Sequence, residues 1–129
     1  LREIAGREAG EAPKVDLAAE RANADMIRTL VASGSVNAVH DIADGGLIVT
    51  IAEMALAGKI GAQLDDTLST AAAFGEDQGR YVVTASPGID IPGAIRIGTT
   101  GGSTVAGVPL TDLRAAHEGF FPKLMDSEL

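Results

Sequence analysis

Cysteine and tryptophan are absent from this sequence of 129 residues, and only 3% of the residues are aromatic. Without cysteine the chain can form neither a disulfide nor a thiolate zinc site, and it has no cysteine nucleophile. Because rings are scarce, the core must be built from Ala, Val, Ile and Leu, which suits helices packed closely on a sheet. Basic residues are also in the minority, since 10 Lys and Arg face 18 Asp and Glu and the net charge is −8. Such a surface repels phosphate backbones, so we expect no nucleic-acid partner.

Long apolar runs are missing as well. A membrane span needs roughly 20 apolar residues, whereas the longest run, residues 47–57, is interrupted by Thr50 and Glu53. We therefore expect no membrane association. The first residues are polar, include Pro13 and do not begin with Met, which indicates a processed chain or a piece of a longer one. We divide the chain into a lead-in linker, residues 1–15, and a single domain, residues 16–129.

Hydrophobic periodicity predicts alternating helices and strands. We expect one helix that Asp16 caps and Gly34 ends, and a second, deeply buried helix over residues 47–57 that ends at Gly58. Short strands are expected at residues 36–42, 60–64 and 81–85. The last third predicts an antiparallel hairpin of strands 94–99 and 104–110 around the turn 100–103. A helix from Asp112 to about Glu118, capped by Thr111, and a tail follow. The predicted class is α+β, a mixed β-sheet with packed helices.

The segment HDIADGGL, residues 40–47, is the first candidate site. Asp41 and Asp44 could share a magnesium ion with phosphate oxygens, because Mg²⁺ prefers such hard ligands. Gly45 and Gly46 would let a ligand approach the backbone at the positive start of the next helix. His40 could shuttle a proton, or it could be a hydrogen-bonded structural residue. A turn with Asp as helix cap and Gly for backbone freedom explains the same residues, and the motif alone favours that reading.

The segment FGEDQGRYVV, residues 74–83, is the second candidate site. Glu76 or Asp77 could join the metal site, Gln78 could line it, and Arg80 could hold a phosphate. The alternative is a loop whose polar groups cap neighbouring elements and whose Arg pairs with an acid, which we favour for Arg80. Residues 99–103, TTGGS, have the composition of a phosphate loop but lack its Lys, so a hairpin turn explains them better. With two histidines and no cysteine, the chain offers little for acid–base or covalent catalysis.

The blocks HDIADGGL and FGEDQ, followed by IGTTGG, resemble the C-terminal repeat of phosphoribosylformylglycinamidine synthases. The likeness covers essentially the whole chain, and the wider superfamily includes aminoimidazole ribonucleotide synthetase. It implies an α+β domain like the C-terminal domain of that synthetase. It also implies a cytoplasmic, ATP- and Mg²⁺-dependent carbon–nitrogen ligase of purine biosynthesis. That ligase converts formylglycinamide ribonucleotide, glutamine-derived ammonia and ATP to the amidine, ADP and phosphate.

The resemblance also implies how this domain would take part. It places the catalytic His and most nucleotide and substrate residues in domains outside this chain, so we expect no catalytic residue here. The residues that would face a nucleotide cleft are His40, Asp41, Asp44, Gly45, Gly46, Glu76 and Gln78, with Asp41 and Asp44 as metal ligands. The implied partners are the remaining domains of the synthase, a separate glutaminase subunit and a small assembly subunit. The alternatives are a stand-alone interaction module and the equivalent domain of a related ATP-dependent enzyme.

Two departures from the family pattern stand out. Ala43 takes a position where Ser is usual, which removes a hydroxyl beside the implied phosphate site. Between Ala85 and Ala94 the family usually has a helix, whereas SPGIDIPG is too short and too rich in Pro to form one. We expect either a deletion or missing residues at this point.

Overall fold

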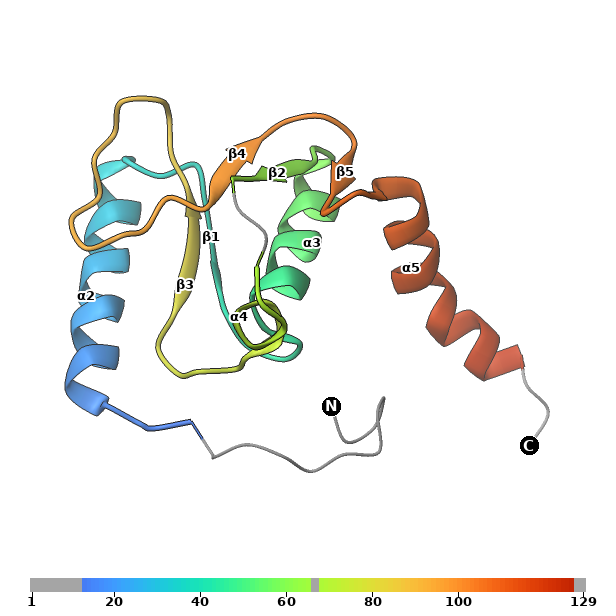
Figure 1. Ribbon diagram of the computed structural model, residues 1–129, viewed down its shortest axis with the longest axis horizontal. Coiled ribbons are helices and arrows are strands. Elements are labelled where there is room, and N and C mark those ends of the chain that lie inside the picture. Colours follow the sequence, from blue (N-terminus) through green and yellow to red (C-terminus); the bar gives the residue numbers. More distant parts are fainter. Residues whose placement is uncertain (1–12, 66–67, 127–129) are drawn as a thin grey trace.

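The computed structural model describes residues 13–65 and 68–126, in which helices alternate with short strands (Figure 1). In chain order the elements are α2 (Leu17–Ser33), β1 (Ala38–Asp41), α3 (Gly46–Gly58), β2 (Ala62–Leu64), α4 (Thr70–Phe74), β3 (Tyr81–Thr84), β4 (Gly98–Thr100), β5 (Thr104–Val105), β6 (Val108–Pro109) and α5 (Leu110–Asp126). Parallel and antiparallel pairings occur together with packed helices, so the predicted α+β class is confirmed.

The strands of the described residues form two sheets. β1 and β3 pair antiparallel from Ala38 opposite Thr84 to Asp41 opposite Tyr81. The second sheet has the order β4-β2-β5-β6, in which β2 and β5 are parallel and the other neighbours are antiparallel. Because β1 ends directly opposite the start of β3, the turn that follows Asp41 lies beside the loop that precedes Tyr81.

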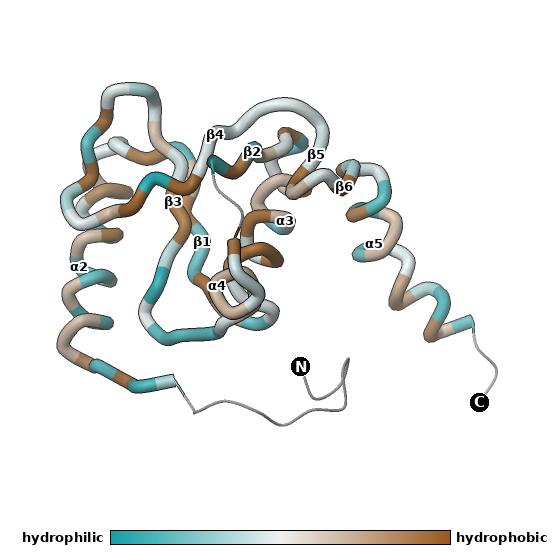
Figure 2. The backbone as a smooth tube through the Cα atoms, in the orientation of Figure 1, coloured by the Kyte–Doolittle hydropathy of each residue, from teal (hydrophilic) through white to brown (hydrophobic). Residues whose placement is uncertain are grey.

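Helix α3 carries the core. Its residues Leu47, Ile51 and Ala55 are buried together with Val82 of β3 and Val105 of β5. One face of α3 therefore joins the two sheets, and Figure 2 shows the concentration of hydrophobic residues along it. Full burial of an aliphatic side chain of this size stabilises a fold by about 1.5–3 kcal/mol. The prediction of a deeply buried second helix is confirmed.

Helix α2 has the ends that the sequence predicts. The Asp16 side chain accepts hydrogen bonds of 3.0 Å from the backbone N–H groups of Ala18 and Ala19. Gly34 ends the helix in the left-handed conformation with φ of 68°. The second helix ends differently from the prediction, since its left-handed C-cap is Lys59 rather than a glycine.

The predicted hairpin of strands 94–99 and 104–110 is wrong. Residues 94–97 are irregular, and β4 and β5 do not pair with each other but with opposite edges of β2. The connection between them passes around the start of β2, where Gly61 exchanges backbone hydrogen bonds with Gly101 and Gly102. A Cβ atom at Gly61 would lie 2.4 Å from the Thr104 carbonyl oxygen, so glycine permits this close passage.

The end of the chain is also more helical than predicted. Helix α5 begins at Leu110 and continues through Pro122 to Asp126, where we predicted a tail after Glu118. Proline inside a helix removes one backbone hydrogen bond and crowds the carbonyl four residues earlier, which is why the sequence predicted an end before Pro122. Thr111 lies inside the helix and donates to the Asp112 carboxylate rather than capping. Helix α4, which Ser69 caps through a 3.2 Å hydrogen bond from Ala72, was not predicted.

Candidate functional site

The turn between β1 and α3 is shaped by its two glycines. Gly45 and Gly46 have φ of 85° and 73°, values that L-residues with side chains rarely adopt. A Cβ atom at Gly45 would lie 2.7 Å from Cγ2 of Val49, and one at Gly46 would lie 2.6 Å from the carbonyl carbon of Phe74. Packing inside the domain therefore accounts for both glycines without any ligand.

Glu76 occupies the start of α3. The backbone N–H of Gly45, the N-cap residue, donates a 2.9 Å hydrogen bond to Oε1 of Glu76. The position follows from α4, which ends at Phe74 against Gly46 and thereby brings the next residues to the helix end. A carboxylate is stabilised there by the positive end of the helix dipole. The α3 N-terminus, which we expected to receive a phosphate, thus has an anion from within the chain.

A polar pocket of about 270 Å³ lies beside this contact. It is lined by Glu20, Asp41, Ile42, Ala43, Asp44, Glu76, Gln78, Gly79, Arg80 and Tyr81. The structure therefore brings together four of the predicted site residues, Asp41, Asp44, Glu76 and Gln78, from two segments. The Asp44 and Gln78 side chains have no hydrogen bond or ion pair within residues 13–65 and 68–126. They are exposed and available to a ligand.

The charge of this pocket is strongly negative. The lining includes four carboxylate side chains and one guanidinium, that of Arg80. The Arg80 guanidinium already donates 2.7 Å to the Gly75 carbonyl and lies 3.3 Å from a carboxylate oxygen of Asp77. The predicted pairing of Arg80 with a neighbouring acid is thus confirmed. Such a pocket attracts cations and repels a phosphate that carries no metal.

His40 lies apart from the pocket lining. Its Nδ1 is 2.7 Å from the Asp41 carbonyl oxygen, and its Nε2 is 3.5 Å from Oε2 of Glu53 on α3. The imidazole is half-buried between these partners. Its contacts fit the structural alternative better than the proton shuttle, and His117 on α5 is exposed as expected.

Helix α2 contributes a part of the site that the sequence did not reveal. Glu20 of α2 lines the pocket, although neither candidate segment of the sequence includes it. The Nδ2 group of Asn23 donates 3.0 Å to the carbonyl of Gly79, 56 residues later, and so ties α2 to the second segment. A Cβ atom at Gly79 would lie 2.8 Å from Cγ of Glu20, so this glycine permits the contact.

Some of the side chains that line the pocket carry oxygen atoms that suit a hard cation. Carboxylate and amide oxygens are ligands that Mg²⁺ accepts, and it usually takes one or two carboxylates together with phosphate oxygens. Among the described residues no group of three or more His, Asp or Glu side chains is arranged to hold a metal ion. Any ion at Asp41 and Asp44 would therefore need further ligands from a substrate, water or another domain.

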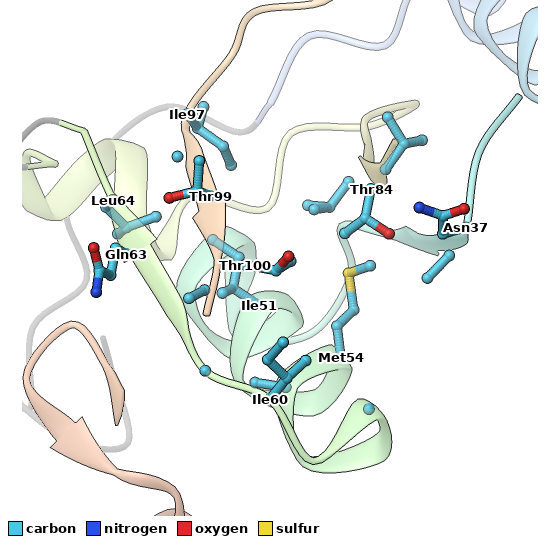
Figure 3. A pocket seen from close by; sticks show the side chains of 18 of the residues that line it. Asn37, Ile51, Met54, Ile60, Gln63, Leu64, Thr84, Ile97, Thr99 and Thr100 are labelled. Carbon is cyan, nitrogen blue, oxygen red and sulfur yellow. The ribbon is translucent and has the colours of Figure 1, made fainter. Parts of the chain in front are cut away.

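A second cavity, of about 310 Å³, lies against α3 and is also lined by residues of both sheets (Figure 3). Figure 3 shows Ile51, Met54 and Thr100 around it, and no ionisable side chain lines it. It offers neither an acid nor a base. The polar pocket, although smaller, therefore holds the groups that can act on a charged ligand.

These features define the class of the protein: an α+β domain whose polar side chains meet in one pocket, with no nucleophile and base paired in its described part. The family model described as "AIR synthase related protein, C-terminal domain" matches residues 1–96. The chain belongs to this family. Within the described residues no helix has both the length and the apolar character to span a membrane.

Curated relatives place the chain within longer proteins. It is 60% identical over 126 residues to phosphoribosylformylglycinamidine synthase subunit PurL of Novosphingobium aromaticivorans, covering 98% of this chain and 18% of the relative. The PurL subunits of Zymomonas mobilis and Rhodopseudomonas palustris are 49% and 46% identical, with 97% of this chain covered in each case and 19% and 20% of the relatives. The chain thus spans about a fifth of the length of these relatives.

The alignment lengths show that some relatives are longer than this chain within the matched region. Those with the Zymomonas and Rhodopseudomonas relatives extend over 141 and 145 positions, more than the 129 residues here, so these relatives contain residues that this chain lacks. The Novosphingobium alignment covers 126 residues and has no room for such an insertion. In the structure residues 85–97 form an irregular connection where we expected the family helix to be missing.

Proposed function

We propose that this chain acts as one domain of a phosphoribosylformylglycinamidine synthase, an ATP-dependent ligase of cytoplasmic purine biosynthesis. The observation that carries the proposal is the meeting of the two segments HDIADGGL and FGEDQ at one polar pocket, joined by the bond between Gly45 and Glu76. Relatives that align with nearly the whole chain are named as subunits of this synthase. The domain then contributes one wall of a cleft, and the chemistry is carried out by other parts of the polypeptide.

The role of the pocket is to hold the cation of a metal–nucleotide complex. Asp41 and Asp44 supply carboxylate oxygens, and Gln78 supplies an amide that can reach the same space. When bound, Mg²⁺ neutralises phosphate charge, which the four carboxylates of this pocket would otherwise repel. Glu76 keeps its position at Gly45 and so holds the wall of the pocket in place. Gly45, Gly46 and His40 lie beside this wall and support it through the backbone.

The proposed partners follow from the reaction. The remaining domains of the synthase complete the nucleotide and substrate sites. Nitrogen comes as ammonia from a separate glutaminase subunit, and a small third subunit supports assembly. The longer polypeptide should therefore use ammonium directly but use glutamine only when these partners are added.

The deciding experiment compares this chain with the longer polypeptide that contains it. Phosphate release is followed with ATP, formylglycinamide ribonucleotide and ammonia. We expect activity from the longer polypeptide and none from the 129 residues alone, and calorimetry with Mg-ATP should give at most weak binding to the latter. Synthase activity of the isolated chain would refute the assignment of the chemistry to other parts of the polypeptide. Absence of activity from the longer polypeptide would refute the proposed function and favour a stand-alone interaction module.

A further inference from the structure

The beginning of helix α5 packs against the rest of the domain. Leu110 and Leu113 pack against the core, and Nη2 of Arg114 donates 2.9 Å to the Leu56 carbonyl near the end of α3. The following turns run away from both sheets in Figures 1 and 2. Residues 120–126 in these turns are all exposed.

The apolar side of α5 continues along the second half of the helix. Residues seven apart lie on the same face of a helix, so Phe120 follows directly from the half-buried Leu113. Phe120, Phe121 and Met125 are 60%, 68% and 83% exposed, and we name these three residues the distal α5 face. The two rings meet edge to face with centroids 5.4 Å apart, which presents them as one apolar surface. Asp112 and Ala115 lie on the opposite side of the helix.

We propose that the distal α5 face docks into an apolar groove of another domain of the same polypeptide. The inference rests on the proposed function, in which this chain is one domain among several. The relatives support such an occupant, because four-fifths of their length lies outside the matched region. The face is also continuous with the core of this domain, as expected of a helix shared by two domains.

Charge argues against a second copy of this chain as the occupant. Each copy has a net charge of −8, so two copies repel each other at moderate ionic strength. An intramolecular partner avoids this difficulty, because covalent linkage raises its effective concentration to the millimolar range or above without any additional contact.

Hydrogen exchange of the longer polypeptide tests the docking. Phe121→Glu should raise exchange of the amides of residues 116–126 by roughly tenfold or more, as expected when a docked segment is released. Ala115→Glu introduces the same charge on the opposite side of α5 and should leave exchange within about twofold of the parent. Equal effects of the two substitutions would overturn the proposal.

Two further measurements identify other occupants. Protection of α5 that grows with protein concentration, together with dimers in sedimentation, would assign the face to a second copy and overturn the proposal. Removal of residues 1–12 that raises exchange as much as Phe121→Glu would assign it to that segment with the same consequence. Synthase activity of the same polypeptide is assayed in parallel. If the polypeptide is active but the amides of α5 are not protected, only the docking is refuted. If the amides of α5 are protected but the polypeptide is inactive, only the proposed function is refuted.

Discussion

The backbone N–H of Gly45 donates a 2.9 Å hydrogen bond to Oε1 of Glu76, and this bond joins two segments that lie 31 residues apart in the chain. Gly45 is the N-cap of α3 and has no side chain to satisfy its first turn. Glu76 supplies an acceptor for the N–H of the cap residue itself, together with a negative charge at the positive end of the helix. The same contact forms one wall of the polar pocket, so stability and site geometry depend on one carboxylate.

Two substitutions of Glu76 should distinguish the contribution of its charge to stability from that of its hydrogen bond. Glu76→Gln keeps an acceptor oxygen but removes the charge, and we expect a loss of about 0.3–1 kcal/mol in the free energy of unfolding, reduced by salt. Glu76→Ala removes the charge and the acceptor together and should lower the free energy of unfolding by about 1 kcal/mol or more. Urea titrations at low and high salt measure both. Asp90→Asn makes the same charge change in the exposed 85–97 connection and should leave the free energy of unfolding almost unchanged. A loss as large as that of Glu76→Gln would contradict the stabilising role of the Glu76 charge at the start of α3.

Two glycines with similar backbone conformations should respond differently to alanine. Gly34 and Gly46 have φ of 68° and 73°, but only at Gly46 would a Cβ atom meet backbone, at 2.6 Å from the Phe74 carbonyl carbon. Gly34→Ala should cost about 1–2 kcal/mol for its left-handed conformation alone. Gly46→Ala should cost at least about 1 kcal/mol more, because α4 must move away from α3. Urea unfolding of the two variants gives the comparison, and equal losses would show that α4 yields without strain.

Asp44 should matter for activity but not for stability. Its carboxylate lines the pocket and has no hydrogen bond or ion pair within the described ranges. Asp44→Asn in the longer polypeptide should therefore leave the unfolding free energy within about 0.5 kcal/mol. Synthase activity should fall by roughly tenfold or more if the carboxylate helps to hold the cation of a nucleotide. Full activity of this variant would remove Asp44 from the proposed site, and a rise in the Mg²⁺ concentration for half-maximal activity would support its role.

Helix α2 should depend on its cap. The Asp16 side chain accepts from two backbone N–H groups, and no residue of α2 is fully buried. Asp16→Ala should destabilise the chain by about 1 kcal/mol and raise amide exchange at the start of α2. Asp25→Ala removes only an exposed pairing with Arg28 on the same helix and should cost less than about 0.5 kcal/mol. Circular dichroism during urea titration measures both, and the opposite order of effects would contradict the dependence of α2 on its cap.

The sequence by itself determined the local features of this protein. Asp16 and Gly34 mark the ends of α2 because a cap and a left-handed residue act on their immediate neighbours. The apolar run of α3 predicts a buried helix since its composition leaves no polar face. The resemblance of the two site segments identified the family, and their acidic and amide residues indicated four members of the pocket lining. The Ser69 cap followed by alanines was a signal for α4 that the prediction did not use.

Only the tertiary structure decided which segments meet. Strands β4 and β5 flank β2 instead of each other, because the partners of a short strand depend on contacts far along the chain rather than on the turn between them. Glu20 enters the pocket since α2 packs against Gly79, which no periodicity of α2 indicates. Glu76 reaches Gly45 because α4 ends against Gly46. Backbone propensities act over a few residues, whereas this pocket is built from three segments that packing around α3 brings together.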